Sequence, residues 1–367
     1  MLDIELKHNS LSNYFESIGY SPVILNGKKQ FQVFSSVGNE FNSITKGVGF
    51  HDISYKGIIE LRGKDSLDFL HRISTNSVKE LSKGNLVQTV FTNDKGKIID
   101  TAVILNFEDH QLLICSESNS MKVSGWINKY IISDDVKINA GSGNYSLIEI
   151  LGQQADSFMS LVCGDVINDI KLNQFKTIFA EGLVFILSKM QELNGDEKFL
   201  IIADDTNAVQ LAKYMIENYG PYDFNLIGNE SYELYRISTG LPGFPNELND
   251  LINPHEAGIL NLVSFTKGCY IGQEVIARLE TYDKVQKYLR RLTFNQPMKI
   301  GENYLLFDGA NEEAGVLTSI SSYPKSNIYS ALGYVKKAFA NHGKELIAKS
   351  ISGNSFNVLV NYFSERK

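Results

Sequence analysis

Cysteine is scarce in this chain of 367 residues, which has three: Cys115, Cys163 and Cys269. The number is odd and the three lie far apart, so the chain lacks the cysteine framework of a disulfide-stabilised secreted domain. Three separated cysteines also cannot supply the four thiolates that usually hold an iron–sulfur cluster. This cysteine usage fits a reducing compartment, and we expect the cytoplasm.

Long apolar runs and runs of one charge are missing as well. No stretch reaches the ~20 apolar residues of a membrane-spanning helix, and residues 1–20 lack the basic start and apolar centre of a secretory signal. Lys and Arg are scattered along a chain whose formal net charge is −7. We therefore expect a small ligand or a protein as partner, rather than a membrane or nucleic acid.

Signatures of bound metals and nucleotides are also lacking. His51 and His255 each have no second ligand at helical spacing, so neither predicts a metal site. No glycine-rich phosphate loop follows a predicted strand, which argues against a flavin-linked enzyme.

The chain does contain enough apolar residues, 43%, to bury a large core, and its length predicts two or three domains. Hydrophobic patterns predict strands at 56–61, 86–91, 97–105, 112–115, 146–151, 183–187 and 199–202, and helices at 65–73, 119–130, 153–162 and 206–218. This order implies two α+β halves. After a polar connection at 283–287, the short apolar runs 291–294, 304–307 and 315–320 predict a small antiparallel barrel or sandwich.

The segment with the most chemical information is residues 265–278, FTKGCYIGQEVIAR. Gly268 and Gly272 flank Cys269 and leave little side-chain bulk to bury it. If a helix begins near Gly272, its N-terminal N–H groups and the neighbouring Lys267 favour the reactive thiolate. The residues alone leave open a second interpretation, in which Cys269 is a small buried apolar residue.

Residues 267–274, KGCYIGQE, with Ala277 and Arg278 after them, resemble the signature of the YgfZ-type folate-binding proteins, the iron–sulfur branch of the aminomethyltransferase-like (GcvT-like) superfamily. Other segments resemble landmarks of this family in the same order, namely 47–54, 75–78, 92–100, 236–242, 253–258, 315–319 and 331–335. The resemblance extends from about residue 41 nearly to the end of the chain.

The resemblance implies an α+β fold of interleaved ferredoxin-like halves around a central folate cavity, plus a C-terminal antiparallel β-barrel. The expected folate-binding region spans 1–286, with one subdomain from 41–140 and 230–286 and another from 141–229. The expected barrel domain spans 287–367. The strand and helix patterns described above agree with this fold.

Tetrahydrofolate or another reduced folate is the implied cofactor. Its pterin edge needs a carboxylate or amide partner and its glutamyl tail needs cations. The residues expected to contact it are Asn76, Asp100, Arg236, Lys267, Gln273, Glu274 and Arg278. Asp100 also matches the catalytic carboxylate of the aminomethyltransferases, and Cys269 is the expected functional thiol. From the residues alone, Asp100 could instead be a turn or cap partner, and Arg278 could pair with Glu274 on a solvated helix face.

Two functions follow from the resemblance, and whether the chain is an enzyme is left open. The favoured one is a tetrahydrofolate-binding accessory protein for the assembly or repair of iron–sulfur enzymes, with client or assembly proteins as partners. The alternative is a folate-dependent aminomethyltransferase. Cys269 favours the first function, because aminomethyltransferases lack this cysteine. Ser238 does too, because they usually carry a carboxylate there, whereas Asp100 favours the alternative.

Overall fold

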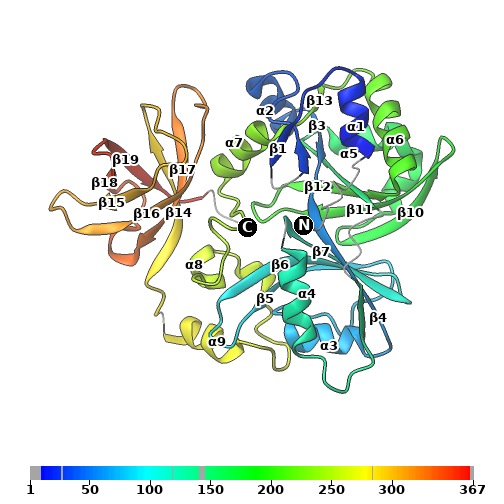
Figure 1. Cartoon of the computed structure of the whole chain (residues 1–367), viewed down its shortest axis with the longest axis horizontal. Coiled ribbons are helices and arrows are strands. Elements are labelled where there is room, and N and C mark those ends of the chain that lie inside the picture. Colours follow the sequence, from blue (N-terminus) through cyan, green and yellow to red (C-terminus); the bar gives the residue numbers. More distant parts are fainter. Residues whose placement is uncertain (1–9, 26–27, 118, 140–144, 283, 364–367) are drawn as a thin grey trace, which may run out of the picture.

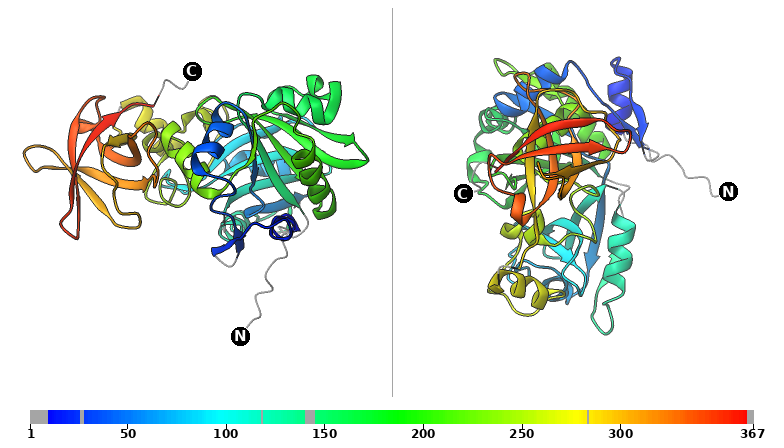
Figure 2. Two further views of the ribbon diagram at one scale, coloured as in Figure 1. Left: turned by 90° about the horizontal axis from the view of Figure 1, so that it is seen from above. Right: turned by 90° about the vertical axis from the view of Figure 1, so that its left-hand side faces the viewer.

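The computed structural model describes residues 10–25, 28–117, 119–139, 145–282 and 284–363. Two β-sheets with helices on their outer sides form the body of the molecule, and a β-barrel lies to one side of both (Figure 1). Figure 2 shows the barrel projecting from the body. The predicted α+β halves and the predicted C-terminal antiparallel barrel are therefore both present.

The first sheet has five strands in the order β5-β6-β7-β4-β8. Its elements are β4 (Lys56–Arg62), α3 (Ser66–Ile73), β5 (Leu86–Thr92), β6 (Ile98–Asn106), β7 (His110–Glu117), α4 (Ser120–Asn128) and β8 (Lys137–Asn139). The predicted hairpin between β5 and β6 forms because the Asn93 side chain accepts hydrogen bonds from the backbone N–H groups of Lys95 and Lys97, both at 3.0 Å. This hairpin pairs Phe91 with Asp100.

The second sheet has six strands in the order β10-β11-β12-β9-β3-β13. Its elements are α1 (Ser10–Ser17), α2 (Val37–Thr45), β3 (Val48–Asp52), β9 (Ser146–Leu151), α5 (Ala155–Cys163), β10 (Gln174–Ala180), β11 (Leu183–Gln191), β12 (Glu197–Ala203), α6 (Asp205–Glu217) and β13 (Phe224–Leu226). Every residue of β9 is buried, because α1, α5 and α6 cover one face of this sheet and the first sheet covers the other.

One boundary differs from the predicted subdomains. The strand β3 lies inside the stretch 41–140 that was assigned to the first unit, yet it pairs with β9 and β13 of the second sheet. The reason is apolar burial, since Phe50 of β3 packs in the core beneath α1 and α5. The halves interleave through this strand and through α7 (Asn229–Thr239), which packs on α2.

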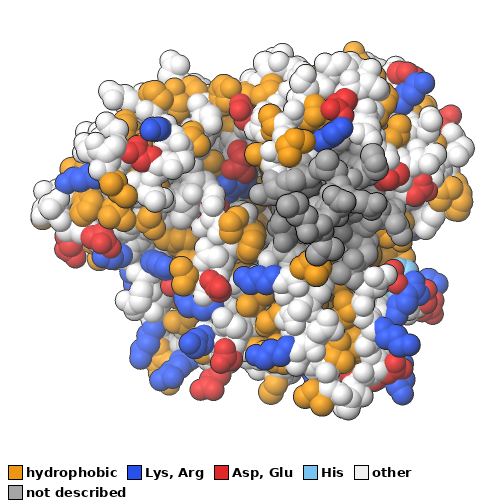
Figure 3. Space-filling view, viewed as in Figure 1, with side chains coloured by type: hydrophobic (Ala, Val, Ile, Leu, Met, Phe, Trp, Pro, Cys, Tyr) orange, Lys and Arg blue, Asp and Glu red, His pale blue; other side chains and the backbone are white. Residues whose placement is uncertain are grey.

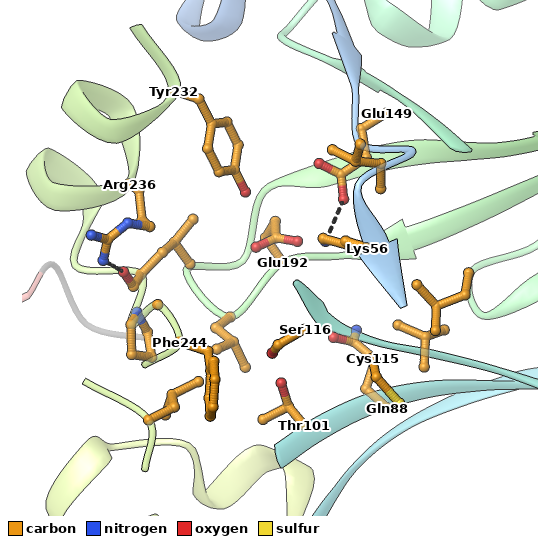
Figure 4. A pocket seen from close by; sticks show the side chains of 18 of the residues that line it. Lys56, Gln88, Thr101, Cys115, Ser116, Glu149, Glu192, Tyr232, Arg236 and Phe244 are labelled. Carbon is orange, nitrogen blue, oxygen red and sulfur yellow. Dashed lines mark hydrogen bonds and ion pairs between the residues drawn. The ribbon is translucent and has the colours of Figure 1, made fainter. Parts of the chain in front are cut away.

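The inner faces of the two sheets pack against each other over part of their length. Ile58, Leu86 and Leu112 of the first sheet meet Leu147 and Leu200 of the second in one apolar cluster. Beyond this cluster the two inner faces separate, and α7 with the segment after it closes the gap (Figure 4). This arrangement creates a cavity between the two sheets.

The barrel is closed, with strand order β14-β17-β16-β15-β18-β19. Its strands are β14 (Lys287–Phe294), β15 (Tyr304–Phe307), β16 (Glu313–Ile320), β17 (Tyr329–Lys336), β18 (Glu345–Ser350) and β19 (Ser355–Asn361). The helices α8 (Pro254–Ala257) and α9 (Gln273–Tyr282) lie between the body and the barrel in the chain. A separate small hairpin of β1 (Val23–Leu25) and β2 (Lys28–Gln30) belongs to the N-terminal part of the body. Leu289 and Leu332 of the barrel share an apolar cluster with Ile237 and Ile252, which fixes the barrel to the cavity wall.

Candidate functional site

A cavity of about 380 Å³ lies where the two sheets separate. Thr101 and Ser116 of the first sheet form its floor, Glu149 and Glu192 lie on the opposite side, and Tyr232 reaches in from α7 (Figure 4). Small-molecule sites are typically clefts of about 300–1,000 Å³ with a few polar groups among apolar ones. The cavity has this size and composition, and it is the candidate site.

Four charged side chains gather on one wall of the cavity. The buried ammonium of Lys198 donates to Glu149 Oε1 at 2.6 Å and also contacts Glu192. Lys56 Nζ lies 3.5 Å from Glu149 Oε1. Burial alone would raise the pKa of Glu149, but the charges of Lys198 and Lys56 hold it well below its usual range. Glu149 is therefore an anion at neutral pH.

Tyr232 adds a neutral polar group to the cavity. Its ring stacks on His51, with ring centroids 4.3 Å apart, and its hydroxyl points into the cavity (Figure 4). Burial raises the pKa of Tyr232 well above its ordinary value, and the charge of Glu149 adds to the rise. The phenol therefore keeps its proton and can donate a hydrogen bond to a ligand.

The cations that line the cavity differ in how many of their N–H donors remain free to bind a ligand. Arg236 uses all five of its N–H donors on the protein: Nε and Nη2 on Glu233, Nη1 on Glu247 and the carbonyl of Leu241, and Nη2 again on Ser319. Arg236 was predicted to bind folate directly. It lines the cavity, but its contacts position Glu233 and tie the cavity wall to the barrel.

Lys56 and Glu192 keep capacity for a ligand. Lys56 makes an ion pair with Glu149 but no hydrogen bond at 3.5 Å. Lys198 contacts one oxygen of Glu192, and no described residue donates a hydrogen bond to the other oxygen. The cavity therefore offers the Lys56 cation to an anionic group of a ligand and a Glu192 oxygen to a hydrogen-bond donor of a ligand.

Asp100 lies directly behind the cavity wall. It is fully buried and accepts hydrogen bonds from Thr101 N at 2.7 Å, Ser116 N at 3.1 Å and Ser116 Oγ at 2.6 Å. Burial raises the pKa of Asp100, although these hydrogen bonds oppose the rise. Ser116 lines the cavity and Asp100 does not, so Asp100 would reach a ligand through the Ser116 hydroxyl.

Lys267, another predicted folate contact, is occupied elsewhere. Its ammonium donates to the carbonyls of His71, Ser74 and Asn76 at 2.5, 2.6 and 2.7 Å, where α3 ends. These three acceptors use all three of its donors. A cation in this position satisfies the free carbonyls of a helix C-terminus, so the structure gives Lys267 a capping role.

The remaining predicted contacts lie outside the cavity lining. The Asn76 side chain donates to the carbonyl of Gln88 at 2.9 Å and holds a turn against β5. Gln273 and Glu274 form the first turn of α9, and Arg278 is exposed further along that helix. The structure therefore does not bring the α9 residues together with Asp100 or Arg236 at one cavity.

The three cysteines differ in exposure. Cys269 is exposed, Cys163 is partly buried and Cys115 is buried. Burial raises the pKa of the Cys163 thiol to about 12, and that of Cys115 well above its ordinary value. Cys269 does not line the cavity. It lies on a surface loop four residues before α9.

Gly272 explains why this loop is tightly held. Its φ of +84° is unfavourable for other residues, and a Cβ atom there would lie 2.5 Å from the carbonyl oxygen of Asn93. The Thr92 hydroxyl donates to the carbonyl of Ile271 at 2.7 Å, also beside the β5–β6 hairpin. The loop with Cys269 is thus anchored to the end of the strand pair that carries Asp100.

Ser238 does not lie on the cavity. Arg236 lies four residues after Tyr232 and three after Glu233, and all three line the cavity from one face of α7. Ser238 lies two residues beyond Arg236, away from this face. Its hydroxyl donates to the carbonyl of Tyr235 at 2.9 Å. Serine at this position therefore removes no carboxylate from the cavity, and α7 presents Glu233 to it instead.

A family model described as the GCVT N-terminal domain matches residues 5–267 of the chain. The chain belongs to this family. A protein of Arabidopsis thaliana named "Putative transferase, chloroplastic" is 30% identical over 324 residues, which cover 87% of this chain and 73% of that protein. An aminomethyltransferase of Staphylococcus carnosus is 25% identical over 353 residues, covering 94% of each chain.

The solved structure of aminomethyltransferase T of the glycine cleavage system from Bartonella henselae matches with a TM-score of 0.85, at 19% identity and over 99% of both chains. This likeness confirms the predicted fold class, an aminomethyltransferase fold with a closed six-stranded barrel at its C-terminus. The predicted membership of the GcvT-like superfamily is confirmed as well.

The charged residues on the cavity wall were not predicted from the sequence. Two of them could have been recognised from the strands that contain them. Glu149 lies in the apolar strand SLIEIL, and Lys198 precedes the apolar run FLIIA. A charge inside an apolar strand needs a partner of opposite charge, and these two residues are each other's partner. Glu192 lies in the turn between β11 and β12, where no pattern distinguishes it.

No helix in the described ranges is long and apolar enough to cross a membrane. Within the same ranges, no three His, Cys, Asp or Glu side chains are arranged to hold a metal ion. On the face shown in Figure 3, basic and acidic side chains are interspersed among apolar ones.

Proposed function

We propose that this chain binds tetrahydrofolate or another reduced folate in the cavity between its two sheets. We also propose that it serves the assembly or repair of iron–sulfur enzymes through the thiol of Cys269, as the YgfZ branch of the superfamily does. The observation that carries the folate proposal is the pairing of available polar groups, Glu192 and Lys56, in a cavity of about 380 Å³.

The chemistry of a reduced folate fits these groups. The pterin ring presents N–H and NH₂ donors along one edge, and a carboxylate accepts such donors with charge-assisted hydrogen bonds. Glu192 has an oxygen free for this purpose, and the Glu233 carboxylate lies on the adjoining wall. Lys56 supplies the cation that an anionic glutamyl tail requires, because the donors of Arg236 and Lys267 are used within the protein.

A binding titration tests the folate proposal. We expect tetrahydrofolate, added anaerobically, to bind with micromolar affinity at best. The Glu192→Gln variant should bind at least about tenfold more weakly, since it loses the charge of an acceptor. Glu197→Gln is the matched control, because Glu197 lies outside the cavity lining and pairs with Lys189. Absence of heat in the native protein, or equal affinity of the two variants, would contradict the proposal.

The accessory role rests on Cys269. Its exposure and its distance in the chain from the cavity-lining strands suit a thiol that meets another protein. A single thiolate can donate one cluster ligand or form a mixed disulfide, but cannot hold a cluster alone. We expect Cys269→Ser to keep folate affinity and thermal stability while losing support of iron–sulfur enzymes in complementation. Full complementation by the serine variant would refute this role, whereas the folate proposal would stand.

An aminomethyltransferase is the second candidate. Relatives with that name cover nearly the whole chain, and Asp100 contacts the cavity wall through Ser116. In this function Asp100 would hold or accept a proton by way of the serine hydroxyl. We expect no release of ammonia from an aminomethylated lipoyl carrier protein. Turnover on the order of 1 per second or faster would favour the transferase over the accessory role.

Location in the cytoplasm stays a prediction. It rests on the cysteine usage, and one of the relatives is named as chloroplastic. The iron–sulfur clients are likewise proposed from the resemblance of residues 267–274 to the YgfZ signature.

A further inference from the structure

A second hollow lies between α8 and the barrel, and we name it the α8–barrel groove. It has a volume of about 340 Å³ and is lined by His255 and Glu256 of α8, residues 288–290 of β14, and Tyr362 and Phe363 after β19. It shares no lining residue with the folate cavity. The groove is thus a separate place where a small molecule could bind.

Arg290 gives the groove a charge without a counter-ion. Its Nε donates to the carbonyl of Ala340 at 2.9 Å, and its Nη1 to the carbonyl of Leu289 at 3.0 Å. Three of its five N–H donors, including both on Nη2, have no acceptor among the described residues. Within the same residues, no carboxylate forms an ion pair with this guanidinium, and the only ionisable groups whose charge acts on its pKa are Tyr362 and Tyr288.

The guanidinium is also fixed in place. The ring of Tyr288 lies 4.8 Å from the guanidinium carbon and the ring of Tyr362 lies 5.0 Å from it. His342 contacts Tyr362 in turn, with ring centroids 5.7 Å apart. The Arg290 side chain is partly buried, and burial lowers its pKa, yet an arginine stays charged at neutral pH. The guanidinium is therefore already oriented before an anion binds.

The other ionisable groups of the groove do have partners. Glu256 pairs with Lys97 at 3.2 Å, and His255 lies 3.4 Å from Glu280. Aromatic rings partly compensate the Arg290 charge through cation–π contact, but they offer no hydrogen-bond acceptor for its remaining donors. The groove therefore has free N–H donors on a positively charged group. These donors lie beside an apolar wall of Tyr288, Tyr362 and Phe363.

We propose that the α8–barrel groove binds a small organic anion, whose carboxylate or phosphate group pairs with Arg290 and whose apolar body packs on the adjoining aromatic rings. Planar guanidinium groups recognise both kinds of anion through paired hydrogen bonds. This site is independent of the proposed folate function, because the two hollows are lined by different residues.

Calorimetric titration of the full chain tests the proposal. Each titration is run twice, once without folate and once with 5-formyltetrahydrofolate in saturating amount. The probes are benzoate and phenyl phosphate, which combine a ring with an anion of either kind, inorganic phosphate, and uncharged benzamide. We expect at least one ring-bearing anion to bind in the millimolar range, and benzamide to give no heat. Binding that disappears when folate is added would place the probe in the folate cavity and overturn the proposal.

Variants of the groove decide which residue recognises the anion. Arg290→Met should weaken binding at least about tenfold, because the charged donors are lost. Tyr362→Leu should weaken the ring-bearing probes and leave inorganic phosphate unchanged. The matched control is Lys349→Met, which removes a barrel cation that lies outside the groove and contacts Asn311. Melting temperatures establish that each variant is folded.

Several results would overturn the proposal. These are no heat from either ring-bearing anion, equal binding by Arg290→Met and the native protein, or inorganic phosphate binding as tightly as phenyl phosphate. A chain that ends at Phe363 provides one more comparison. If anions bind only after residues 364–367 are removed, the chain's own end competes for the groove, and an external ligand is not its occupant.

Discussion

Lys198→Met is the substitution that tests the charged wall of the cavity most severely. In the native chain Lys198 is buried and bridges Glu149, at 2.6 Å, and Glu192. Methionine fills a similar volume but donates no hydrogen bond and has no charge. The variant leaves the buried Glu149 carboxylate with two neighbours, Lys56, whose ammonium lies 3.5 Å away, and His51, whose Nδ1 lies 3.6 Å away.

The expected cost is large because one partner of a buried ion pair is removed. Such a change leaves an uncompensated charge, and typical losses are about 3–5 kcal/mol in the free energy of unfolding. Replacing both partners, as in Lys198→Met with Glu149→Leu, should restore most of the loss, since a buried ion pair can often be exchanged for apolar residues of similar volume. Urea unfolding followed by circular dichroism measures both variants.

The loss should depend on pH in a definite direction. In the native chain the pKa of Glu149 is lowered, so this group stabilises the fold above its unfolded pKa of about 4.3 and loses that effect as the pH falls through its folded pKa. In Lys198→Met, burial still raises the pKa of Glu149, but the positive charge of Lys198 no longer opposes this rise. Protonation of Glu149 then favours folding, and the stability gap to the native chain should narrow between pH 7 and about pH 5.

Lys189→Met is the matched control. Lys189 also contacts two carboxylates, Asp156 and Glu197, both at 2.9 Å, but these carboxylates are 57% and 46% exposed. Exposed pairs contribute about 0–1 kcal/mol, so this variant should lose little. If Lys198→Met costs no more than Lys189→Met, or if its deficit grows on acidification, the reasoning about the buried pair is wrong.

Three further predictions concern other parts of the chain. Lys267→Met should lower the free energy of unfolding by about 1–3 kcal/mol and speed hydrogen exchange at the end of α3, measured by mass spectrometry, because three carbonyls lose their donor. Ser319→Ala should cost a similar ~1–3 kcal/mol in urea unfolding, since it leaves a buried donor of the cavity wall without its acceptor. Alkylation at neutral pH, mapped by peptide mass spectrometry, should modify Cys269 before Cys163 and Cys115, whose thiols burial keeps protonated.

Much of the fold could be predicted from sequence because its signals are local. Strand and helix patterns identified most elements of the first sheet and half of those of the second, and the Asn93 turn identified the β5–β6 hairpin. The strand β3 was grouped wrongly because its partner β9 lies about a hundred residues later in the chain, and pairing over such a separation leaves no mark on either strand. A change in composition at 283–287 predicted a β domain after it, and β14 begins at Lys287.

The site was harder to predict because its residues meet only in three dimensions. Lys267 and Arg236 were expected to face a ligand, but the structure shows that the protein itself accepts every one of their hydrogen bonds. A sequence records that a residue is a cation and does not record how many of its donors remain free. Glu192 and Lys56 differ from them because each keeps an oxygen or a donor that the protein does not use.

A crystal soaked with 5-formyltetrahydrofolate tests the central claim most directly. We expect density for one folate between the two sheets, with the donor edge of its pterin ring against Glu192 and its glutamyl tail toward Lys56. An empty cavity at saturating folate, or a folate bound only on the α9 surface near Gln273 and Arg278, would contradict the account.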